Sequence, residues 1–215
     1  MNRLRPDAGL ALRQYPFRGR LRALASGLIM SNPRIIAGKA KGMRLKTLPG
    51  TITRPITDRV KEALFNIIGS DIVDAKFLDL FGGSGSVGIE ALSRGAEFAE
   101  FVEINAKAYA VLRENLEKSG FHDKSGLVKG DAFKFISTEK DIRFDYIFIA
   151  PPQYHGLWKD ALLLLDQNAA LLSENGWIIA QIDPVEDEPL ELNVFSEFDC
   201  RRYGSTLLKF YSFSE

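Results

Sequence analysis

The chain has 215 residues, of which 46% are hydrophobic and 26% charged, and its formal net charge is zero. These values are typical of one soluble α/β domain with a sizeable core. One cysteine (Cys200), two histidines and the lack of an apolar run near 20 residues argue against an internal disulfide, a metal site and a membrane span, so we expect a cytoplasmic protein.

The basic residues are concentrated near the N-terminus. Residues 1–50 contain eleven Lys or Arg and one acid, Asp7, so this portion carries +10 and the remainder −10. A basic segment on an acidic body favours a polyanionic partner, most simply nucleic acid; a solvated basic tail is the alternative. We expect residues 1–29 to be a disordered extension. They are also compatible with a transit peptide or with a true start at Met30.

Residues 30–50 are predicted to form a basic β-hairpin, because short apolar pairs flank Gly38 and Gly42. Residues 51–215 are predicted to form the main domain. It begins with a helix that Thr57 or Asp58 can cap. The predicted buried face of that helix consists of Val60, Ala63, Leu64, Ile67 and Ile68.

Residues 77–95 are the stretch around which the domain is organised. An apolar run at 77–81 predicts a buried parallel strand, and glycines follow it at 82, 83 and 85. A helix is predicted next, ending at Gly95. We expect its inward residues to be Val87, Ile89, Ala91 and Leu92, and its outward residues to be Glu90, Ser93 and Arg94.

A strand, a glycine turn and a helix predict a ligand site, since glycine lets the backbone approach a ligand and a helix N-terminus offers free N–H groups. Gly83 to Gly88 match the dinucleotide pattern G-x-G-x-x-G. However, Asp79 precedes the turn and would repel a pyrophosphate. A carboxylate there suits the ammonium group of S-adenosylmethionine and favours it over NAD. A turn that only permits close packing is the alternative.

Strands and helices alternate through the rest of the chain. Strands are predicted at 98–104, 125–129, 144–149, 177–182, 194–203 and 205–212, and helices at 106–119, 132–137 and 158–172. This order predicts a doubly wound, Rossmann-like, mostly parallel sheet whose last two strands form an antiparallel hairpin. Ligands bind such sheets at the carboxyl ends of the strands, where Asp79, Glu103 and Asp131 fall. Glu103 can accept hydrogen bonds from both ribose hydroxyls, and Asp131 can accept one from an adenine amine. A site for a nucleoside cofactor is therefore favoured over the alternative that these acids are only solvated loop carboxylates.

With these motifs in place, the chain resembles class I S-adenosylmethionine-dependent methyltransferases. More closely, it resembles the bacterial family that methylates the N2 amine of a guanine in small-subunit ribosomal RNA. The matching sequences are R-I-I-A-G-K-A-K-G at 34–42, R-P-I-T-D-R-V-K-E-A-L-F-N at 54–66 and L-D-L-F-G-G-S-G-S-V-G-I-E-A-L-S-R-G-A at 78–96. The resemblance implies a seven-stranded sheet with the last strand antiparallel, an RNA-contacting basic hairpin, S-adenosylmethionine as cofactor and the small ribosomal subunit as partner. We expect a monomer.

The resemblance and the strand-end positions together give three sets of candidate site residues. The RNA-binding candidates are Arg34, Lys39, Lys41 and Arg44. The cofactor-binding candidates are Arg54, Thr57, Asp79, Phe81, Gly82, Gly83, Ser84, Gly85, Glu103, Ile104, Asp131 and Ala132. The catalytic candidates are Ala150, Pro151, Pro152, Gln153 and Tyr154.

The chain departs from the family at the catalytic strand end. The family has Asp or Asn, then Pro-Pro and an aromatic residue; here Ala150 stands first and Tyr154 comes one place late. In the family pattern, the acidic or amide side chain and a proline carbonyl accept the amine hydrogens. Ala150 has no side-chain acceptor, so Gln153 or the loop backbone is expected to compensate. An RNA- and cofactor-binding protein with little transfer activity is the alternative, and an NAD oxidoreductase is a third interpretation that rests only on the glycines.

Overall fold

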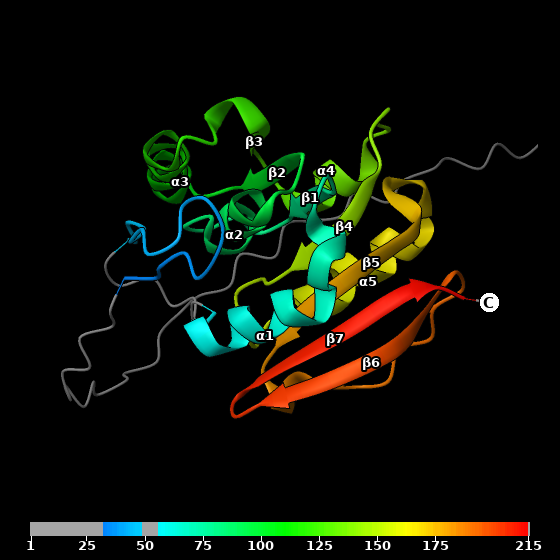
Figure 1. Ribbon diagram of the computed structural model, residues 1–215. Coiled ribbons are helices and arrows are strands. Elements are labelled where there is room, and N and C mark those ends of the chain that lie inside the picture. Colours follow the sequence, from blue (N-terminus) through cyan, green and yellow to red (C-terminus); the bar gives the residue numbers. More distant parts are fainter. Residues whose placement is uncertain (1–31, 49–55, 215) are drawn as a thin grey trace, which may run out of the picture. The chain divides into compact units, whose positions relative to one another are not determined.

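The computed structural model describes residues 32–48 and 56–214 (Figure 1). The expected extension at 1–29, Met30 and the candidate Arg54 lie outside the described residues.

A seven-stranded sheet in the order β3-β2-β1-β4-β5-β7-β6 forms the centre of the domain. Strands β1 to β5 pair in parallel, and β7 lies antiparallel between β5 and β6 (Figure 1). The bounds are β1 (Lys76–Asp79), β2 (Phe98–Glu103), β3 (Ser125–Lys129), β4 (Phe144–Ile149), β5 (Leu172–Ile182), β6 (Phe195–Tyr203) and β7 (Thr206–Phe213). The predicted doubly wound, mostly parallel sheet with a reversed last strand is confirmed.

Five α-helices in the described part of the chain cover the two faces of this sheet. They are α1 (Asp58–Ile68), α2 (Ser86–Arg94), α3 (Ala106–Ser119), α4 (Ala132–Ser137) and α5 (Leu157–Gln167). Apolar residues of α1, α2 and α3 share one buried cluster, and those of α4 and α5 share a second. The apolar strands are therefore buried on both faces, as parallel strands require.

The fifth helix is shorter than predicted. It ends at Gln167 rather than at 172, because the Asn168 amide donates to the Leu164 carbonyl (2.8 Å) and closes the last turn. A 3₁₀ turn, Ala169–Leu171, follows, and β5 then begins at Leu172, five residues before the predicted 177. This part of the strand was not predicted because residues 173–175 are polar and interrupt the apolar pattern of the sequence.

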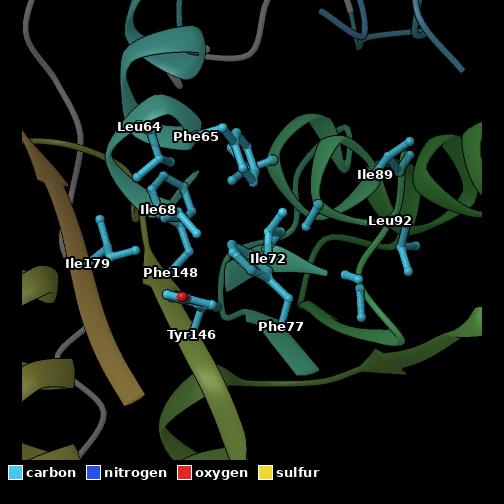
Figure 2. Close-up of a cluster of buried hydrophobic side chains, with 14 of the residues drawn as sticks. Leu64, Phe65, Ile68, Ile72, Phe77, Ile89, Leu92, Tyr146, Phe148 and Ile179 are labelled. Atoms are coloured by element: carbon cyan, nitrogen blue, oxygen red, sulfur yellow. The ribbon is translucent and has the colours of Figure 1, made fainter. Parts of the chain in front are cut away.

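Helix α1 packs onto the sheet beside β1. Its predicted cap is confirmed, since the Thr57 hydroxyl accepts from the Val60 N–H (3.3 Å). Figure 2 shows the cluster in which Phe65 stacks on Phe77, with ring centroids 6.3 Å apart, and Phe77 stacks on Tyr146. The buried face differs from the prediction in part and consists of Val60, Lys61, Leu64, Phe65 and Ile68.

Residues 32–48, hereafter the basic loop, fold back on themselves but do not form the predicted regular hairpin. The two arms form one antiparallel bridge, Arg34–Arg44, with backbone hydrogen bonds from Ile35 to Met43 (2.9 Å) and from Leu45 to Pro33 (2.8 Å), and neither arm is a strand. Ile35 and Leu45 point into the core and are 1% and 0% exposed. Other backbone N–H groups of the loop donate to side chains of α2 and α3, so the cross-arm bonds do not extend into a regular ladder.

The outward face predicted for α2 is wrong at Glu90 and Ser93, which are both buried. The Glu90 carboxylate accepts from the N–H groups of Ile36 (2.7 Å) and Ala37 (3.0 Å). Ser93 donates to the Ala37 carbonyl (2.6 Å) and accepts from the Ala40 N–H (2.9 Å). These side chains are buried because the basic loop covers the side of α2 that faces away from the sheet.

The loop approaches α2 so closely that residue 38 must be glycine. A Cβ there would lie 1.8 Å from the Ser93 carbonyl oxygen, and the backbone has φ +79°. Lys61 secures the other side of this contact: it is fully buried and donates to the Arg34 carbonyl (2.7 Å) and the Ser86 hydroxyl (3.0 Å). Its ammonium also lies 3.4 Å from a Glu90 oxygen.

Candidate active site

A cavity of about 510 Å³ lies at the carboxyl ends of β1, β2, β3, β4 and β5, where ligands bind in sheets of this kind. Eleven of the candidate residues line it: Asp79, Phe81, Gly82, Gly83, Ser84, Glu103, Ile104, Asp131, Ala132, Ala150 and Pro152. A second, more open hollow lies at the amino ends of the strands and includes Lys76, Glu97 and Asp145. It contains none of the candidates and has mostly charged walls, so the first cavity is the candidate site.

The glycine turn forms the floor of the cavity. Gly83 has φ +52°, and its N–H donates to the Glu103 carboxylate (2.9 Å), so the turn is tied to the end of β2. Gly85 does not line the cavity; a Cβ there would lie 2.3 Å from Leu112. At Gly88 a Cβ would lie 2.3 Å from the Phe101 ring. Close packing therefore requires Gly85 and Gly88, while Gly83 faces the ligand space.

Asp79 is a buried acid with few partners among the described residues. It is 2% exposed, and one carboxylate oxygen accepts a long bond from the Gly88 N–H (3.4 Å). Burial raises the pKa of Asp79 to about 7, assisted by the Glu103 charge and opposed by hydrogen bonds from the Gly88 and Phe81 backbone. Such a group gains most from a cation placed in the cavity.

Glu103 and Asp131 have structural roles that leave acceptor capacity. Glu103 accepts from Gly83 with one oxygen and from the Asn105 N–H (2.6 Å) with the other. Asp131 caps α4 through one oxygen, which accepts from Phe133 (2.8 Å) and Lys134 (3.1 Å). Since a carboxylate has about four acceptor positions, both can also bind a ligand.

Apolar side chains close the space between these carboxylates. Phe81 contacts Phe133 edge to face, with ring centroids 6.4 Å apart. Ile104, which is 68% exposed, projects beside Glu103. An apolar space flanked by hydrogen-bond acceptors is the form of site that binds an adenine and its ribose.

The strand end after β4 contributes two of its five catalytic candidates to the cavity, Ala150 and Pro152. Pro151 is buried, and Gln153 is half-buried and outside the cavity wall. Tyr154 has φ +68° and is 64% exposed. Its hydroxyl donates to Asp183 (3.0 Å) and its N–H to Glu186 (2.8 Å).

Several lining residues were not predicted from the sequence, notably Asn105, Phe133 and Gln181. Asn105 and Phe133 each stand two residues after a predicted carboxylate, so the strand-end argument could have been extended to them. Gln181 is the polar residue of the apolar run 177–182 and is 7% exposed. A buried amide near a strand end was the available signal.

The basic loop reaches the same cavity. Lys39, Lys41 and Arg44 are exposed, whereas Arg34 pairs with Asp58 (2.6 Å). Thr47 and Leu48, at the end of the loop, line the cavity. The loop that carries the exposed cations therefore ends at the cavity, while Lys39 itself lies beside Ser93 at the C-terminal end of α2.

Asn115 of α3 fixes this end of the loop. It is buried, and its amide accepts from the Lys46 N–H (2.9 Å) and donates to the Lys46 carbonyl (3.0 Å). The same amide donates to the Ser84 carbonyl (2.9 Å). One side chain thus joins the basic loop to the glycine turn.

Within the part of the chain that the structure describes, no three His, Cys, Asp or Glu side chains are grouped so as to hold a metal ion. None of the described helices is long and apolar enough to span a membrane.

Residues 33–212 match the family described as Conserved hypothetical protein 95. The chain belongs to this family. It is 37% identical to ribosomal RNA small subunit methyltransferase D of Escherichia coli K12 over 147 residues, which cover 67% of this chain and 69% of the relative. The protein of the same name from Haemophilus influenzae is 33% identical, over 73% of this chain and 81% of the relative. The family is thus one of methyltransferases, as the sequence motifs implied.

Solved structures agree with the observed fold. A hypothetical protein of Thermus thermophilus has a TM-score of 0.68 and 29% identity, covering 83% of this chain and 98% of that one. An RNA methyltransferase from Salinibacter ruber, in complex with S-adenosyl-L-homocysteine, has a TM-score of 0.56 and 16% identity, covering 75% and 95%. The predicted Rossmann-like methyltransferase fold is confirmed, and the Salinibacter ruber protein holds S-adenosyl-L-homocysteine on this fold.

Proposed function

We propose that this chain transfers a methyl group from S-adenosylmethionine to the exocyclic N2 amine of a guanine in small-subunit ribosomal RNA. The observation that carries the proposal is the strand-end cavity. It combines the glycine turn, Asp79, Glu103 and Asp131 with a Pro-Pro strand end, in a chain similar to relatives named ribosomal RNA small subunit methyltransferase D.

When bound, S-adenosylmethionine supplies an electrophilic methyl group on a positively charged sulfur. The buried Asp79 carboxylate holds the ammonium of the amino-acid portion. Glu103 accepts from the ribose hydroxyls, and Asp131 accepts from the adenine amine with the oxygen that does not cap α4. The Phe81–Phe133 pair and Ile104 exclude water from the adenine.

The target base enters beside Ala150 and Pro152, flipped out of its helix. The basic loop binds the RNA backbone through Lys39, Lys41 and Arg44. Most of the acceleration comes from holding the amine and the methyl group in line. The protein provides positioning, and the amine nitrogen is the nucleophile.

Ala150 supports a second candidate function: a protein that binds RNA and cofactor with little transfer. The two are separated by incubating the purified protein with radiolabelled S-adenosylmethionine and either deproteinised small-subunit RNA or assembled subunits. The proposal expects N2-methylguanosine in digests of at least one substrate. Binding of both ligands without any labelled nucleoside would favour the second candidate.

The basic loop gives a prediction about salt dependence. Reversing the charge at Lys39, Lys41 and Arg44 should weaken RNA binding and reduce the salt slope by about 2–3, since each lost phosphate contact removes about 0.7–0.9. Filter binding at several salt concentrations measures this, while cofactor affinity should not change. Charge reversal at Arg201 and Arg202 on β6, at the far edge of the sheet, is the control. An unchanged slope in the loop variant would remove the loop from the RNA interface.

Asp79 gives a prediction about pH. The pKa of Asp79 is about 7 in the folded protein, and its ordinary value is 3.8. At pH values between these two, Asp79 is therefore protonated in the folded, ligand-free protein and ionised in the unfolded chain. The contribution of Asp79 to stability is therefore most favourable below pH 3.8 and falls as pH rises to 7. A bound ammonium prefers the carboxylate, so affinity for S-adenosylhomocysteine should rise up to about tenfold per pH unit between pH 5.5 and 7. Calorimetry tests this; an Asp79→Asn variant with the same pH profile would contradict it.

A further inference from the structure

The strand end at Ala150 lacks a side-chain acceptor, but the neighbouring strand has one at the same level. Strands β4 and β5 pair in parallel with Ile149 opposite Ala180. The next residues along the two strands are Ala150 and Gln181, which are therefore neighbours. Adjacent strands lie about 4.8 Å apart, so the side chain at 181 begins about that distance from the backbone of Ala150.

Ala150 and Gln181 also share a face of the sheet. Phe148 and Ile179, two residues before them, belong to the same buried cluster (Figure 2), and side chains two apart on a strand point to the same side. Ala150 packs against that cluster, and both residues line the cavity. The longer Gln181 side chain can therefore reach the volume that the small Ala150 side chain leaves open.

The Gln181 amide has bonding capacity for a ligand. The residue is 7% exposed and lines the cavity, and its side chain has no hydrogen-bond partner among the residues that the structure describes. No buried side-chain nitrogen or oxygen among the described residues lacks a hydrogen-bond partner, so the polar atoms of the Gln181 amide open onto the cavity rather than into the core. Gln153, by comparison, is half-buried and outside the cavity wall.

We propose that Gln181 supplies the hydrogen-bond acceptor that orients the target amine, in place of a side chain at position 150. This rests on the proposed function. Its carbonyl oxygen accepts one amine hydrogen, and its NH₂ group donates to the unprotonated ring nitrogen beside that amine. An amide fits an edge of this kind, such as N2 and N3 of guanine, because it presents one acceptor and one donor together.

The orientation matters for the reaction. With one amine hydrogen held by Gln181 and the other by the Pro151 carbonyl, the nitrogen lone pair points at the methyl group. The N–C bond forms as the S–C bond breaks, the sulfur keeps the electron pair as a thioether, and the amine proton leaves to solvent. Gln181 accepts a hydrogen bond and takes no proton.

The test compares Gln181→Ala with the wild type in single-turnover methyl transfer to small-subunit RNA. We expect a rate reduction of about 10²–10³-fold, the usual effect of losing one such partner. Affinity for S-adenosylhomocysteine should stay within about twofold, and affinity for RNA should fall by no more than about fivefold, since only one contact to the base is lost. Adding Ala150→Asn to Gln181→Ala should restore at least tenfold of the rate. Gln167→Ala, at the exposed end of α5, is the matched control and should equal the wild type.

A binding measurement tests the contact without turnover. With S-adenosylhomocysteine present, the wild type should bind guanosine monophosphate about fivefold more tightly than inosine monophosphate, which lacks the 2-amino group. A fivefold preference corresponds to about 1 kcal/mol, the usual net contribution of one hydrogen bond. NMR titration should show that Gln181→Ala loses this preference.

Three outcomes would overturn the inference. In the first, Gln181→Ala keeps its rate and its nucleotide preference; in the second, Gln153→Ala loses the rate instead; in the third, the rate falls only in proportion to cofactor affinity. A wild-type protein that methylates no RNA would contradict the proposed function itself. If Ala150→Asn alone then created activity, Gln181 would not be a working substitute.

Discussion

Replacing Lys61 with Met should lower the free energy of unfolding by about 3–5 kcal/mol, the range for removing one partner of a buried ion pair. Lys61 and Glu90 are both fully buried. Burial lowers the pKa of Lys61, and the Glu90 carboxylate opposes that shift. Without the ammonium, the Arg34 carbonyl loses a donor, and among the described residues Glu90 keeps only Arg94 and two backbone N–H groups as partners. Urea unfolding measures the loss.

A second variant separates the effect of the unpaired Glu90 charge from the effect of lost side-chain packing. Adding Glu90→Gln to Lys61→Met should recover part of the stability, because the unpaired carboxylate is then neutral. The control is Lys124→Met, at an exposed position of the turn His122–Lys124, which should change stability by less than about 0.5 kcal/mol. If Lys61→Met unfolds at the same urea concentration as the control, the buried network does not stabilise the fold.

Replacing Glu103 with Ala should weaken cofactor binding about 10–100-fold. This corresponds to about 1–3 kcal/mol, the cost of leaving polar groups without their hydrogen-bond partner. The ribose hydroxyls would lose their acceptor. In addition, the Gly83 N–H would lose the bond that holds the glycine turn to β2. Calorimetry with S-adenosylhomocysteine measures the effect, and RNA affinity should be unchanged.

Glu97→Ala is the matched control, since Glu97 is exposed and lies beside the amino end of the same strand. Its affinity should equal that of the wild type. Glu103→Gln should fall between the two, because the amide oxygen can still accept from Gly83. Wild-type affinity in Glu103→Ala, or binding of NAD in place of S-adenosylhomocysteine, would refute this assignment of the ribose site.

Local signals in the sequence were enough to predict the sheet and eleven of the residues that line the cavity. The alternation of apolar strands and helices determines a parallel sheet, and carboxylates at strand ends then converge because all those ends lie at one edge. Thr57 caps α1 as predicted because a cap depends only on the next three residues.

Residues whose partners lie far away in the chain were not predictable in this way. Glu90 and Ser93 look outward on a helical wheel, but the basic loop, more than 50 residues earlier, buries them. The direction of Tyr154 depends on Asp183 and Glu186, about 30 residues later. Gln181 becomes a site candidate only when the β4–β5 register places it beside Ala150.

The most direct test of the proposed function is mass spectrometry of nucleosides from small-subunit ribosomal RNA of cells with and without this gene. We predict that deletion removes one N2-methylguanosine per subunit. We also predict that the wild-type gene restores it and that Gln181→Ala does not restore it fully. An unchanged N2-methylguanosine content in the deletion strain would contradict the proposed function.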